Sequence, residues 1–162
     1  MIAKFVGISV SAALLACLVA TPMRAKADDS KFDSPIIGSS LRTPIAGVPS
    51  GGAPWVVSRG HTRLESSGEL RVEVTGLLLG AAAGANAGTT AGIPQIAASV
   101  VCGDVVVATT DPVLYPATGS FEIRDMLTLT PPGCPGAVVL IRIVRPANTP
   151  AGPYIAVSGV LN

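Results

Sequence analysis

One histidine and a few scattered carboxylates are the side chains of this chain that could carry out acid–base chemistry. His61 is the only histidine, so any mechanism that uses an imidazole must use it. Ser58, Thr62 and Glu65 lie close to it in sequence, but the G-x-S-x-G pattern of a nucleophile elbow is missing. We therefore predict no catalytic residue and no enzyme. The alternative is a hydrolase or metal-dependent enzyme that uses His61.

The carboxylates show no pattern that would hold a metal ion or a cofactor. They form neither a calcium loop nor the pair of acids that glycoside hydrolysis needs. A metal site would have to be built from one histidine and acids that are far apart in sequence. We therefore expect no cofactor, no cofactor-binding residue and no metal ligand.

The first 27 residues have the pattern of a secretory signal peptide. Lys4 precedes an uncharged apolar run from Phe5 to Ala20, and small residues surround the end of the segment at Ala27. The run is short for a membrane span, which needs about 20 residues. We expect cleavage between Ala27 and Asp28 and a secreted or periplasmic mature chain.

A bacterial lipoprotein is the alternative to a freely exported chain. The residues before Cys17, Leu-Leu-Ala, resemble a lipoprotein processing box, which would attach a lipid to Cys17. Against this, the apolar run continues for three residues after Cys17, where a mature lipoprotein would turn polar.

The predicted mature chain is nearly neutral. The full chain has 11 basic and 10 acidic residues, and removal of Lys4, Arg24 and Lys26 leaves 8 basic against 10 acidic, a net charge of −2. The remaining basic residues form no run. We therefore predict no binding to nucleic acid and no attraction to an anionic membrane.

Two cysteines remain after the predicted cleavage, Cys102 and Cys134. An even number of cysteines in an exported chain favours a disulfide, and no CxxC spacing supports a redox or metal pair. On the chain-entropy model, closing a loop of this size stabilises the fold by roughly 3–4 kcal/mol. We predict a structural disulfide between these two residues.

The elements that would position these side chains are short strands. Residues 28–54 are rich in Pro, Gly and Ser and predict an extended lead-in, with at most a short edge strand at Ile36–Ile37. Residues 69–75 (ELRVEVT) alternate between polar and apolar within a strand expected at 69–78, and Ser66-Ser67-Gly68 before it predicts a hairpin loop that joins it to 61–65. Further strands are expected at 55–59, 61–65, 95–102, 105–110, 120–130, 138–144 and 154–161.

Two details of these strands can be tested. Gly103-Asp104 lies between two runs of β-branched residues and predicts a two-residue hairpin loop. The alternation in 120–130 would place Asp125 on the inner side, so we predict a bulge near Arg124–Met126 that returns this charge to solvent.

About eight short strands without a convincing helix predict an all-β fold. The expected architecture is a single antiparallel β-sandwich of the immunoglobulin-like kind over residues 55–162, and a small β-barrel is the alternative. Trp55, at the start of the first clear strand, is expected to fill the core.

The segment 79–94 contains GAAAGANAGTTAG, with a glycine at every fourth position. Such spacing could pack membrane helices, but polar residues and Pro94 interrupt the segment and its flanks follow a strand pattern. A phosphate-binding loop would need the Lys-Ser/Thr pair that is missing here. We predict a flexible surface loop between two strands.

Several stretches together resemble a group of exported bacterial β-domain proteins without an established activity. They are GVPSGGAPW, GELRVEVTGL, VVCGD, PGCPGAVVLIRIV and YIAVSG, within residues 35–161. The shared patterns are G-V-P-x-G-G-x-P-W and G-x-L-x-V-E-V-x-G-L, with one cysteine at each of two strands or strand ends. The resemblance implies export, a single β-domain and pairing of Cys102 with Cys134, and it supplies no catalytic residue.

These observations favour a non-enzymatic binding or structural module of the cell envelope or exterior. Its ligand or protein partner is unknown from the sequence. We expect the mature chain to be a monomer without a membrane span.

Overall fold

A computed structural model of the chain describes residues 30–39, 43–129, 134, 136–145 and 151–158. The predicted signal peptide, the expected cleavage between Ala27 and Asp28, and Cys17 lie outside the described residues.

The described part of the chain folds almost entirely into β-strands, as predicted. Nine strands form one sheet in the order β7-β6-β10-β11-β1-β3-β4-β9, with β8 paired to β6, and every pairing is antiparallel. Two short strands, β2 and β5, pair separately. The bounds are β1 Ser30–Gly38, β2 Trp55–Val56, β3 Arg59–Glu65, β4 Glu69–Thr75, β5 Leu78–Leu79, β6 Gln95–Cys102, β7 Val105–Thr109, β8 Val113–Leu114, β9 Phe121–Met126, β10 Val138–Val144 and β11 Tyr154–Ser158.

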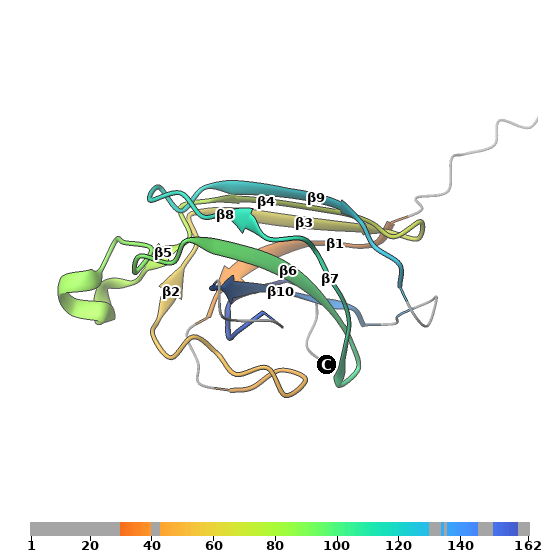
Figure 1. The fold of residues 1–162 in the computed structure, drawn as a ribbon, viewed down its shortest axis with the longest axis horizontal. Coiled ribbons are helices and arrows are strands. Elements are labelled where there is room, and N and C mark those ends of the chain that lie inside the picture. The colour runs from red at the N-terminus through yellow and green to blue at the C-terminus, as the bar shows by residue number, and fades with distance from the viewer. Residues whose placement is uncertain (1–29, 40–42, 130–133, 135, 146–150, 159–162) are drawn as a thin grey trace, which may run out of the picture.

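The strands do not separate into the two sheets of the predicted immunoglobulin-like sandwich. They form one sheet curled into a half-barrel, which is nearer to the barrel alternative (Figure 1). The physical reason is β1, which joins the strands β7, β6, β10 and β11 on one side to β3, β4 and β9 on the other. Its first part pairs with β3, where Asp33 lies opposite Arg63, and its last part pairs with β11, where Ile37 lies opposite Val157.

The segment expected to be an extended lead-in contains this central strand. β1 is nine residues long and lies inside the sheet, so the prediction of a short edge strand at Ile36–Ile37 was wrong. Residues 43–54 also pack on the sheet. Val48 belongs to a buried cluster with Leu140 and Val157, and the backbone of Ser50 bridges to that of Tyr154. This segment therefore covers the outer face of β10 and β11.

The main core lies inside the curl, between the two halves of the sheet. Strand β4 shows why, because its apolar residues all point inward and are buried while its polar residues are exposed. β10 is buried along its whole length, which explains its nearly continuous apolar sequence. Trp55 is buried in this core, as predicted. The largest fully buried side chains of this core are Leu64, Leu70, Leu77, Ile96, Ile123, Ile141 and Ile155.

Both predicted hairpin loops are confirmed. β3 and β4 are joined by Ser66-Ser67-Gly68, and Cys102 pairs with Val105 across Gly103-Asp104. The predicted bulge near Arg124–Met126 was wrong, since β9 keeps a regular register with β4 through Met126. Asp125 instead accepts backbone N–H groups of Asp111, at 3.3 Å, and Met126, at 2.8 Å. The carboxylate is thus satisfied without a bulge.

The Gly/Ala segment lies between β5 and β6, at the left of Figure 1. It contains a short 3₁₀ helix, η1, over Ala81–Asn86. Gly84, Gly88 and Gly92 have φ values of 60°, 74° and 65°, which side chains with a Cβ rarely adopt. Three of the four regularly spaced glycines therefore allow the backbone conformations of turns. Within the described residues, no helix has the length and apolar character needed to cross a membrane.

The predicted disulfide between Cys102 and Cys134 is present. The two Cα atoms are 5.4 Å apart, and Cys134 is buried. The bond joins the end of β6 to the residues that lead into β10.

Candidate functional site

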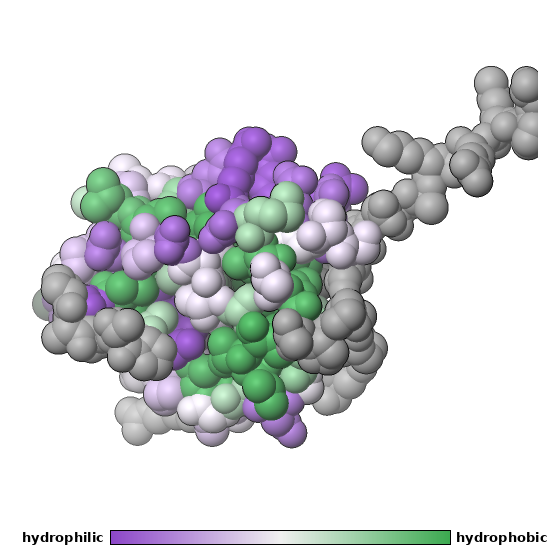
Figure 2. Space-filling view, turned by 45° about the vertical axis from the view of Figure 1, so that its right-hand side comes forward, coloured by the Kyte–Doolittle hydropathy of each residue, from purple (hydrophilic) through white to green (hydrophobic). Residues whose placement is uncertain are grey.

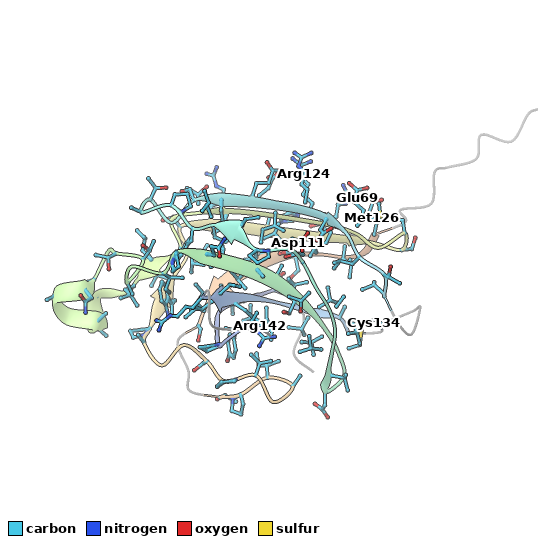
Figure 3. The ribbon with its side chains drawn as sticks, in the orientation of Figure 1. Glu69, Asp111, Arg124, Met126, Cys134 and Arg142 are labelled. Atoms are coloured by element: carbon cyan, nitrogen blue, oxygen red, sulfur yellow. A yellow bond between two sulfur atoms is a disulfide. The ribbon has the colours of Figure 1, made fainter. Side chains whose placement is uncertain are left out.

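The outer side of β1, β3, β4 and β9 carries most of the exposed charge that the structure describes. We call this surface the charged face (Asp33, Arg59, His61, Arg63, Glu65, Glu69, Arg71, Glu73, Glu122 and Arg124). Figure 3 shows Glu69 and Arg124 on the outer side of the upper strands, and Figure 2 shows the hydrophilic surface as a purple area along the top. The strand alternation that buries Leu70, Val72 and Val74 produces this face.

The register of the strands sorts the charges into rows that run across the sheet. Arg71 of β4 lies directly opposite Arg63 of β3 and Arg124 of β9, and we call these three residues the arginine row. Glu73, two residues further along β4, lies opposite His61 and Glu122, and we call these the His–Glu row. Three arginines therefore stand side by side in the first row, and two glutamates stand side by side in the second.

Ion pairs between the rows compensate these charges. Arg71 pairs with Glu73 of its own strand and with Glu122 at 3.5 Å, and Arg124 also pairs with Glu122. All of these side chains are roughly half exposed, with 46% of Arg71 and 59% of Arg124 open to solvent. Exposed pairs of this kind contribute little to folding stability, typically 0–1 kcal/mol each.

His61 lies in this face beside a residue that sequence reasoning did not assign to it. Its Nε2 atom contacts the carboxylate of Asp33 in β1, and Arg63 lies 4.0 Å from the other oxygen of that carboxylate. These residues line an open hollow of about 220 Å³ together with Arg71 and Glu73. The hollow is smaller than a typical ligand pocket.

The polar residues near His61 in sequence are not its partners in the structure. Thr62 points to the opposite side of β3 and is buried. Among the residues that the structure describes, no hydroxyl or thiol hydrogen-bonds to His61, and no group of three His, Cys, Asp or Glu side chains could hold a metal ion. The disulfide of Cys102 and Cys134 lies in the other half of the sheet, so these predicted site residues do not join the face.

A second charged residue missed by sequence reasoning is Arg142, which is only 8% exposed on β10 (Figure 3). Its Nε donates to the carbonyl of Gly152 at 2.7 Å, and its Nη2 donates to the carbonyl of Ala151. Nη1 lies 3.4 Å from Ser99 Oγ. Burial lowers the pKa of Arg142. The bonds hold the backbone before β11 against β10, which is a structural role.

Another open hollow, of about 280 Å³, lies where the β3–β4 hairpin meets the chain after β9. It is lined by Ser66–Gly68 and Met126–Leu129, none of which is charged. Its lining contains the hydroxyls of Ser66, Ser67 and Thr128 but no side chain that could act as a base to activate them.

No protein-family model, curated protein or solved structure matches this chain. The resemblance to exported bacterial β-domain proteins therefore stays a hypothesis based on the quoted stretches.

Proposed function

We propose that this protein is an exported, non-enzymatic binding or structural module of the cell envelope or exterior, and that the charged face is its contact surface. The arginine row carries the proposal. Like charges placed directly opposite each other destabilise a sheet, and here three arginines occupy such positions on consecutive strands. A face that only had to stay soluble could alternate the signs between strands. Ion pairs within the face compensate part of this cost, but Arg71 and Arg124 share Glu122, and contact with a partner would offset the rest.

The form of the face supports binding more than chemistry. The hollow around His61 is open and small, and both members of the His61–Asp33 pair are about half exposed, at 53% and 45%. Catalytic groups gain most where water is excluded, because charges interact more strongly there. A wide, exposed surface with charges of both signs fits another polar surface.

Export is supported by the sequence of residues 1–27 and by the disulfide. Disulfides persist mainly in oxidising compartments outside the cytoplasm. Lipid attachment at Cys17 stays the alternative to a free mature chain. The intact mass of the mature protein separates the two, because a chain that begins at Asp28 cannot carry that lipid.

The contact surface can be tested by NMR titration of the mature chain at low salt. The probes are heparin as a polyanion, polylysine as a polycation and dextran as a neutral polymer. We expect heparin to shift the amide signals of the arginine row, polylysine to shift those of the His–Glu row, and dextran to shift neither. Arg71→Gln should weaken heparin binding several-fold and Arg145→Gln, outside the face, should not. Signals of the face that stay unchanged with both charged polymers would refute the proposal.

A hydrolase is the second candidate, and the contact of Asp33 with His61 favours it. A carboxylate that orients an imidazole is the arrangement of a general base, and here the base would act on a water molecule. Release of p-nitrophenol from p-nitrophenyl acetate and p-nitrophenyl phosphate tests this. A rate that His61→Ala abolishes would support the hydrolase, and rates equal to those of buffer would exclude it for these two substrate classes.

A further inference from the structure

The charged face carries rows of opposite sign in the same order on neighbouring strands. On β4, Arg71 lies two residues before Glu73, and on the antiparallel β9, Arg124 lies two residues after Glu122. The positive row and the negative row are thus parallel to each other, and they are separated by about 7 Å, twice the rise per residue of a strand.

On β4 and β9 this pattern is complementary to itself, whereas on β3 the same exchange of rows sets Arg63 opposite His61. A twofold axis that lies in the plane of the face, between the two rows and perpendicular to the strands, exchanges the rows. Arg71 of one copy then meets Glu73 of the other, and Arg124 meets Glu122. The same contacts are made twice, as in any isologous dimer. We propose that the partner of the charged face is a second copy of this chain, docked face to face in this way.

The charge of the whole face is compatible with self-association. It contains four arginines (Arg59, Arg63, Arg71 and Arg124) and five carboxylates (Asp33, Glu65, Glu69, Glu73 and Glu122), so two copies have little net repulsion. Each guanidinium has five N–H donors, and those of the arginine row are half exposed. They can therefore donate to a second carboxylate, from the other copy, while they keep their own partner.

The size of the face sets the strength of this contact. Four strands about 4.8 Å apart and two rows about 7 Å apart, together with the residues on either side of the rows, give a footprint of a few hundred Å². A stable interface buries roughly 800 Å² per partner. The dimer is therefore weak and forms at high local concentration and low salt. It agrees with the expected monomer in dilute solution.

This inference names the partner of the surface in the proposed function and so rests on it. Sedimentation equilibrium of the mature chain tests it, from about 10 µM to 1 mM, at about 10 mM and 500 mM NaCl, where the screening length falls from roughly 30 Å to below 8 Å. We expect the average mass to rise with concentration at low salt and to stay monomeric at high salt. A constant monomer mass at low salt would overturn the proposal.

Variants that exchange the charges of Arg71 and Glu73 on β4 test the arrangement of the dimer. Arg71→Glu and Glu73→Arg each place like charges in contact across the twofold axis, so each should weaken the dimer at least about tenfold, which corresponds to 1.4 kcal/mol. The double variant restores opposite charges across the axis and should dimerise within about twofold of the wild type. Arg145→Glu is the matched control outside the face and should change nothing. Circular dichroism verifies that each variant is folded.

The double variant also separates this inference from the proposed function. It breaks the arginine row, so it should bind heparin more weakly than the wild type while it still dimerises. A double variant that dimerises as poorly as the single variants would overturn the face-to-face dimer. If the wild type nevertheless binds heparin in that case, the proposed contact surface stays supported and only the dimer is refuted.

Discussion

Tyr115 connects the chain after β8 to the segment between β4 and β5. Its hydroxyl donates a hydrogen bond to the backbone carbonyl of Leu77, and its ring packs edge to face on Phe121, with 5.8 Å between the ring centroids. The side chain is buried, and burial raises the pKa of Tyr115. The phenol therefore stays neutral in the folded protein at a pH where it ionises in the unfolded chain.

Tyr115→Phe should lower the free energy of unfolding at pH 7 by about 1 kcal/mol, because the Leu77 carbonyl loses its donor. Above about pH 10 the unfolded wild type releases the phenol proton and the folded wild type does not, so stability falls as the pH rises. The variant lacks this loss. Urea unfolding at both pH values should show a smaller difference between the two proteins at high pH. A difference that grows with pH would contradict the assignment.

Single residues were predictable from the sequence where their role depends on their own chemistry. His61 could be singled out because it is the only histidine, and Trp55 could be assigned to the core. Asp33 could not be assigned as the partner of His61, because it belongs to a Pro/Gly-rich segment without a clear strand pattern. Arg142 could have been noticed, since it is the one charged residue of the apolar run VVLIRIV.

Among the elements, the β3–β4 hairpin determines the arrangement of the charged face. Its loop at Ser66-Ser67-Gly68 sets the register that places Arg63 opposite Arg71. Gly68 has a φ of 94°, and a Cβ at this position would lie 2.1 Å from the carbonyl oxygen of Leu127. The hairpin loop therefore requires glycine for its conformation and for the close approach of the chain after β9.

Gly68→Ala should destabilise the fold more than Gly88→Ala. Both residues have positive φ, which costs a residue with a Cβ about 1–2 kcal/mol, but a Cβ at Gly88 has no atom within 4 Å. The clash with Leu127 should add roughly 1–3 kcal/mol at Gly68. Urea unfolding of the two variants measures the difference. Equal losses would mean that the hairpin loop moves away from Leu127 at little cost.

The hairpins were predictable because their loop residues specify them locally. The opposition of Arg63 and Arg71 follows from the predicted loop, whereas Arg124 joins the row only through the pairing of β9 with β4, which joins segments far apart in sequence. The bulge in β9 was predicted because a charge on the inner side looked unfavourable. The side chain of Asp125 lies on the edge strand β9, where the backbone N–H groups of Asp111 and Met126 donate hydrogen bonds to its carboxylate.

At the scale of the whole molecule, the disulfide links the two cysteines across 32 positions of sequence. The double variant Cys102→Ala/Cys134→Ala should lose roughly 3–4 kcal/mol of stability on the chain-entropy model. Wild-type protein reduced with dithiothreitol should show the same loss in urea unfolding. A loss below about 1 kcal/mol in both would show that the unfolded chain gains little freedom when the bond is absent.

The all-β antiparallel class was predictable from the sequence, but the single curled sheet was not. Alternating residues show which side of a strand is buried, and a sandwich and a half-barrel bury the same sides. The difference depends on β1, which pairs on its two sides with β3 and with β11. Such pairing between distant segments leaves no local pattern.

The position of β1 has a consequence for how the polypeptide acquires its shape as it is made. The first described strand pairs with the last, and Ile36 meets Ser158. A nascent chain that leaves the ribosome from its N-terminus keeps one edge of that strand unpaired until β11 has been synthesised. The two parts of the sheet can be joined only after β11 has emerged, so the open edge of β1 is exposed to other polypeptides and to chaperones while the residues between the two strands are made.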